Sequence, residues 1–80
     1  MVDSKELDMI ASEFAVKLGQ IIREARLAKG LSQKGLSKLS GIHACNISWW
    51  ENGKHLPSVY SLVRIAHILD LDLKISFGGE

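Results

Sequence analysis

The side chains best placed for chemistry in this chain lie near its middle. Within residues 44–49, four side chains fall at spacings of one, four and five, which bring them to one side of a helix: Ala44, Cys45, Ser48 and Trp49. Small apolar groups can contact thymine methyl groups, and a hydroxyl can donate to or accept from several bases. This side of the helix is therefore a candidate for reading base-pair edges in a DNA groove.

The charges of the chain are segregated along its length. Residues 17–64 carry eight Lys or Arg against two Glu, a balance of +6, whereas residues 1–16 balance at −3 and residues 65–80 at −2. A basic middle between acidic ends is what a local phosphate-binding face needs. Charge alone fits a solvated helix surface equally well.

Two short helices joined by a tight turn are expected to position the candidate edge. Ser32 stands in N-cap position for the first, whose buried side would hold Leu36 and Leu39. Ser40-Gly41-Ile42 indicates the turn. A second helix over about 44–51 would bury two residues three positions apart, Ile47 and Trp50, and end at Asn52-Gly53. Such a pair of helices lays its second member in the major groove.

Further helices are predicted on both sides of this pair. One helix would run from about Ser4 to Lys29 and end at Gly30, and Gly19 inside it leaves a kink or a break into two helices open. Its expected inner face holds Leu7, Ile10, Phe14, Leu18, Ile21 and Ala25, which recur at steps of three or four. After Pro57, Ser58 can cap another helix. Its inner face would hold Leu62, Ile65, Ala66 and Leu69.

The last part of the chain changes period. Apolar and polar residues alternate over residues 70–77, which is typical of a half-buried strand. A lone strand leaves its backbone groups unpaired, so a two-fold related copy of the chain is its expected partner. A chain of 80 residues has a thin core, which also favours a dimer.

The middle of the chain resembles the Cro/cI-like (XRE) helix-turn-helix family, over about Leu18 to Leu71. The resemblance rests on Arg26, Gly30 to Gln33, the small-x-x-x-Gly of Ser37 to Gly41, Ile47, and Glu51 to Gly53 with Pro57 after them. It implies an all-α, lambda-repressor-like domain of four to five helices. With the expected strand added, residues 1–80 form one domain, with a helical extension at 3–17, a core at 18–69 and the strand at 70–77.

The resemblance also implies roles for single residues. Arg26 and Glu51 match an ion pair that ties the first helix to the end of the recognition helix, against the alternative of two independent surface charges. Gln33 matches a phosphate contact at a helix N-terminus. The full set expected to contact phosphates is Gln33, Lys34, His43, Asn46, Asn52 and Lys54. Trp49 is expected either to meet DNA or to be covered by a neighbouring subunit.

Three features depart from the family pattern. Gly35 replaces the usual Glu, so the capping box begun by Ser32 is not completed. His43 replaces the Ser or Thr that usually caps the recognition helix. The alternating tail resembles that of the antitoxin-type members rather than the fifth helix of phage repressors.

These observations favour a dimeric repressor that binds double-stranded DNA at a palindromic operator, with half-sites roughly 34 Å apart. The alternative is an antitoxin that binds a toxin protein and represses its own operon. A third hypothesis is a helix-turn-helix fold that is used only for contact with other proteins.

Other chemistries find little support in the sequence. His43, Cys45, His55 and His67 lack any zinc spacing, so no metal or other cofactor is expected. Cys45 beside His43 lacks an orienting third group, and no other catalytic set is visible, so no enzyme activity is expected. One cysteine excludes an intramolecular disulfide. Without a secretory signal or a membrane span, the expected location is cytoplasmic and nucleoid-associated.

Overall fold

The computed structural model describes residues 3–73, which form four helices and no strand. In chain order these are α1 (Ser4–Ala28), α2 (Gln33–Ser40), α3 (Ala44–Glu51) and α4 (Val59–Ile68). The prediction of an all-α helix-turn-helix fold is therefore confirmed. The strand was expected at residues 70–77: of these, residue 70 lies in a turn, residues 71–73 have no regular structure, and residues 74–77 lie outside the described residues.

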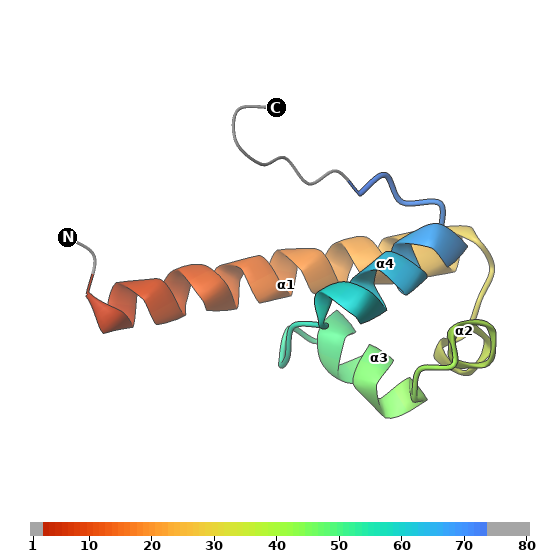
Figure 1. Ribbon diagram of the computed structural model, residues 1–80, viewed down its shortest axis with the longest axis horizontal. Helices are drawn as coiled ribbons and strands as arrows, with labels where there is room; N and C mark the ends of the chain where they lie inside the picture. The colour runs from red at the N-terminus through yellow and green to blue at the C-terminus, as the bar shows by residue number, and fades with distance from the viewer. Residues whose placement is uncertain (1–2, 74–80) are drawn as a thin grey trace.

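The helices gather around one half of α1. Figure 1 shows α2, α3 and α4 beside its second half, while its first half projects beyond them. Residues 3–14 are accordingly all exposed. The core is a cluster of Ile22, Leu36, Ile47, Trp50, Ile65 and Leu69, to which each of the four helices contributes.

Short-range hydrogen bonds start three of the four helices. Asp3, Ser32 and Ser58 each accept a backbone N–H of the first turn, at 2.9 to 3.1 Å. His43 stands at the N-cap of α3 and makes no such bond with its side chain. Because an imidazole caps poorly, α3 depends on its packing against the other helices for stability.

Two expectations about inner faces are wrong. Leu39 is 61% exposed because α2 turns Leu36 and Ser40 to the core instead. The buried face of α1 is formed by Ala15, Gly19, Ile22 and Arg26, whereas four residues of the predicted face are exposed: Leu7, Ile10, Phe14 and Ile21. Of the large apolar side chains of α1, Ile22 thus reaches the core, whereas these four do not.

Gly19 allows α1 and α3 to touch through their backbones. A Cβ atom at Gly19 would lie 2.1 Å from the carbonyl oxygen of Trp50 and 3.0 Å from that of Glu51. The helix is not broken at this glycine, because α1 runs through it as one element of 25 residues. Gly53 makes a similar close approach, because a Cβ there would lie 2.8 Å from Cγ2 of Val16.

Because of this close contact, we expect replacement of Gly19 by alanine to destabilise the protein, although the same replacement stabilises most helices. Replacing glycine by alanine inside a helix normally stabilises it by about 1 kcal/mol. At Gly19 the added methyl group overlaps the Trp50 carbonyl, so we expect Gly19→Ala to lower the free energy of unfolding by about 1 to 3 kcal/mol. Urea denaturation measures the change, and Gln20→Ala, at the exposed neighbouring position, is the control. A Gly19→Ala variant as stable as the parent would contradict the close contact.

Candidate nucleic-acid interface

A buried ion pair fixes the end of α3 against α1. Arg26 donates from Nε to Oε2 of Glu51 at 2.7 Å and from Nη2 to Oε1 at 2.9 Å, and both side chains are almost fully buried. Its Nη1 donates to the carbonyl of Leu31 at 2.8 Å, just before α2. The hydrogen bond and charge of Glu51 raise the pKa of Arg26. One guanidinium thus joins α1, the α1–α2 loop and the last residue of α3.

Gln33 belongs to the same network. Its Nε2 donates to Oε1 of Glu51 at 3.1 Å, so the side-chain amide connects the first residue of α2 with the last residue of α3. The sequence assigned this side chain to a DNA phosphate, whereas its observed partner is within the protein. The backbone N–H of Gln33 lies in the first turn of α2, where N–H groups lack helical partners.

The turn between α2 and α3 is held by hydroxyl and guanidinium groups. Ser37 donates to the carbonyl of Ile42 at 2.5 Å, and the hydroxyl of Ser40 accepts from the Ile42 N–H at 3.2 Å. Arg64 of α4 donates from Nε to the Ser40 carbonyl at 3.1 Å and also from Nη2. Gly41 follows with φ of +75°. Arg64 therefore caps the C-terminus of α2, a role that sequence spacing did not reveal.

The candidate reading edge lies on the outer side of α3. Cys45 is exposed and Trp49 is 44% exposed, while Ala44 and Ser48 are half-buried. The opposite side of α3 is buried in the core. The four side chains proposed from their spacing thus share a surface that another molecule can reach.

Trp49 is oriented by a histidine that the sequence analysis did not assign to the interface. The rings of Trp49 and His55 pack edge to face, with centroids 5.2 Å apart and planes at 62°. The loop that carries His55 is tied back to α3, because the Lys54 N–H donates to the Trp49 carbonyl at 2.9 Å. The indole therefore has a defined place beside α3.

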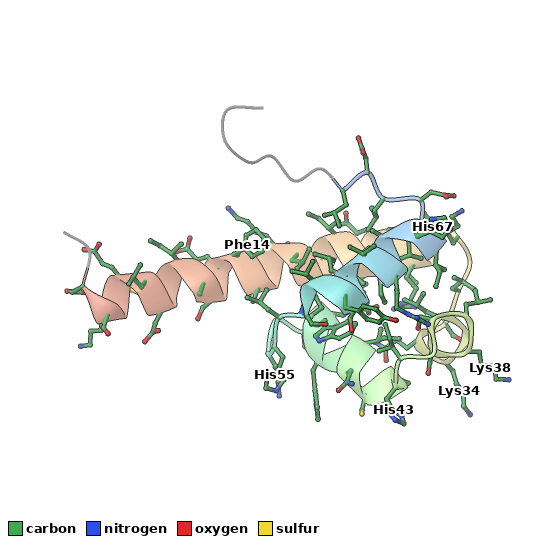
Figure 2. All side chains as sticks on the ribbon, in the orientation of Figure 1. Phe14, Lys34, Lys38, His43, His55 and His67 are labelled. Carbon is green, nitrogen blue, oxygen red and sulfur yellow. The ribbon has the colours of Figure 1, made fainter. Side chains whose placement is uncertain are left out.

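Basic side chains flank this edge. Figure 2 shows Lys34 and Lys38 of α2, His43 before α3 and His55 after it on the side of the molecule turned away from α1. All four are exposed, as is Lys54. Lys38 was not among the expected phosphate contacts, although its position follows from the helical step of four after Lys34.

Two other residues expected to contact phosphates have side chains that are bonded or partly buried within the protein. Asn52 donates from Nδ2 to the carbonyl of Ser48 at 2.9 Å, so its side chain closes the end of α3. Asn46 is half-buried on α3.

Between residues 3 and 73, no group of three or more His, Cys, Asp or Glu side chains is arranged to hold a metal ion. None of the helices described is both long and apolar enough for a membrane crossing.

The sequence and structure are similar to those of known proteins. Residues 22–75 match the helix-turn-helix family. The chain is 41% identical over 59 residues to the ImmF control region 10 kDa protein of Bacillus phage phi105, covering 74% of this chain and 66% of that protein. It is 40% identical over 57 residues to the uncharacterized HTH-type transcriptional regulator y4dL of Sinorhizobium fredii, covering 71% of this chain and 29% of that protein.

A solved structure is also similar to this chain. The crystal structure of the restriction-modification controller protein C.AhdI from Aeromonas hydrophila matches with a TM-score of 0.71 and 38% identity, over 75% of this chain and 91% of that one. The chain thus spans nearly all of that controller and slightly under two thirds of the phage protein.

The buried pair predicts strong coupling between Arg26 and Glu51. Removing one partner of a buried pair leaves the other charge uncompensated, which typically costs about 3 to 5 kcal/mol. We expect Arg26→Met and Glu51→Leu each to destabilise the fold strongly, and the double variant to lose much less than the sum, as a double-mutant cycle measures. Glu24→Leu, at an exposed position of α1, is the control. Additive losses would contradict the coupling.

Proposed function

The chain belongs to the helix-turn-helix family of DNA-binding transcriptional regulators, and we propose that it acts as a dimeric repressor of a palindromic operator. The observation that carries the proposal is the exposed edge of α3, flanked by basic side chains and held by the buried pair of Arg26 and Glu51. In this proposal α3 enters the major groove, and the two copies read half-sites roughly 34 Å apart.

We propose that the outer edge of α3 makes the base contacts. Ala44 and Cys45 are small enough to meet thymine methyl groups, Ser48 offers a hydroxyl, and Trp49 presents an indole face to sugars or methyl groups. The edge lacks the Arg, Gln or Asn side chains that pair with a base through two hydrogen bonds. Part of the specificity is therefore assigned to the shape and deformability of the operator.

Phosphate contacts are proposed on both sides of this edge. Lys34 and Lys54 supply exposed cationic groups, His43 offers an exposed imidazole, and Lys38 extends the same surface. The N-terminus of α2 offers the Gln33 N–H, which suits an anion. Asn46 and Asn52 complete the set, with the Asn52 amide acting from its position at the end of α3. These contacts fix the register on the duplex without reading its sequence.

No catalytic step is part of the proposal, since regulators of this family act by occupying DNA. A cytoplasmic location at the nucleoid follows from the proposed partner.

An antitoxin is the second candidate, favoured by the first half of α1. This half lies before the family match at residues 22–75, is acidic and exposes apolar side chains. Such a helix suits contact with another protein better than contact with DNA. A toxin-sized protein of different sequence that copurifies with the chain in stable stoichiometry would favour this candidate over the plain repressor.

The proposed phosphate contacts predict a change in salt dependence. Selection from a random pool of duplexes gives the preferred sequence, and fluorescence anisotropy at several salt concentrations then gives the affinity. We expect Lys34→Ala and Lys54→Ala each to reduce the slope of log affinity against log salt by about one per contact. Affinity should fall about equally for all sequences, because phosphate contacts read none.

Lys5→Ala is the matched control, because Lys5 is an exposed lysine at the far end of α1. Its slope should equal that of the parent protein. Equal effects of all three substitutions, or binding that does not depend on salt, would contradict the assigned face and favour a fold used for protein contact.

The packing of His55 on Trp49 predicts a loss of specificity without a loss of phosphate contacts. We expect His55→Ala to free the indole and reduce the ratio of preferred to random-sequence affinity several-fold, with little change in the salt slope. His55→Phe keeps a ring beside Trp49 and should retain most of the ratio. An unchanged ratio in His55→Ala would show that Trp49 needs no such support.

A further inference from the structure

The first half of α1 exposes an apolar stripe. We call residues 4–14 the arm. Leu7, Ile10 and Phe14 are 56 to 59% exposed and stand three and four positions apart, so they share one side of the helix. The stripe is therefore a candidate contact surface for another chain.

A second unpartnered apolar surface lies on α4. Val59, Tyr60 and Val63 are exposed there, and a groove of about 390 Å³ follows, lined by Val63, Arg64, His67 and Ile68. We call this surface the α4 face. Arg64 beside this groove is already engaged: its guanidinium lies over the Tyr60 ring, with 5.6 Å from Cζ to the ring centroid, and donates to the Tyr60 hydroxyl at 3.3 Å. The face therefore offers an ordered tyrosine ring beside an apolar groove, an arrangement against which a further aromatic ring can pack.

The two surfaces have complementary charges. The arm holds three acidic side chains and one lysine, a balance of −2. Residues 59–68 contain no acidic residue, and Arg64 and His67 lie on them. Two arms placed against each other would bring like charges together, whereas an arm placed on the α4 face brings opposite charges together.

We propose that the arm of one copy packs on the α4 face of a second copy, with Phe14 entering the groove, and that the second arm returns the same contact. A two-fold arrangement of this kind covers both surfaces of both copies and closes the assembly at a dimer. The inference rests on the proposed dimeric operator binding and assigns its interface. Figure 2 places Phe14 and His67 on one side of the molecule and Lys34, His43 and His55 on another, so the DNA-reading side stays open.

Cross-linking between two separately purified variants tests the contact. In a Cys45→Ser background, Phe14→Cys and Val63→Cys proteins are mixed and treated with a short bis-maleimide. We expect the mixture to give at least tenfold more mixed dimer than Met9→Cys with Val63→Cys. Met9 is the matched control, because it is 63% exposed on the same arm but lies off the stripe.

Equal yields from the two mixtures would overturn the proposal. A Phe14→Cys protein that cross-links chiefly to itself would also overturn it, because the arms would then pack on each other.

Sedimentation equilibrium gives a second measurement. We expect Phe14→Glu and Val63→Glu each to weaken dimerisation at least tenfold, and Met9→Glu to leave it unchanged. Circular dichroism checks that the core remains helical, since both positions are exposed.

The two proposals fail in different ways. A parent protein that is monomeric while it binds its preferred duplex, or whose arm is covered only by a copurified protein of different sequence, overturns the interface and leaves DNA binding intact. A parent protein that dimerises as described but binds no duplex in a salt-dependent way overturns the function and leaves the interface intact.

Discussion

The position of α3 depends on the buried contact between Arg26 and Glu51. The guanidinium meets both carboxylate oxygens and the carbonyl of Leu31, and Gln33 donates to the same carboxylate. A charge removed from water needs this full set of partners to be tolerated. Because these partners come from α1, the α1–α2 loop, α2 and α3, the buried pair fixes how α1, α2 and the end of α3 meet. The same region lets the backbones of α1 and α3 touch at Gly19.

The outer surface of α3 follows from this constraint. With Ile47 and Trp50 held in the core, the remaining side of a two-turn helix is turned outward, and Cys45 and Trp49 become accessible. The helix has no side-chain cap at its N-terminus, so packing supplies the order there that DNA recognition requires. Arg64 and His55 extend this support to the two ends of the surface, by capping α2 and by packing on the indole.

The sequence predicted features with a local origin more completely than those that depend on contacts between distant residues. The ends of α2 and α3 agree with the structure because Ser32, Gly41 and Gly53 have clear local roles. The buried face of α1 was misjudged because its apolar period runs on into residues 4–14, which project beyond the other helices, and because the close backbone approach at Gly19 turns Ala15, Ile22 and Arg26 inward. The roles of Arg64 and His55 depend on pairs that are distant or set by loop geometry, which periodicity does not encode. The expected contacts of single residues with DNA remain proposals.

Base-pair recognition is proposed for the outer edge of α3. Its most direct test is the affinity of the parent protein and of Ser48→Ala for every single base-pair variant of the preferred duplex. We expect this substitution to relax the preference at one symmetric pair of positions by about 0.5 to 1.5 kcal/mol, the net value of one hydrogen bond, and to leave the others unchanged. A preference profile that is identical for the two proteins at every position would contradict it.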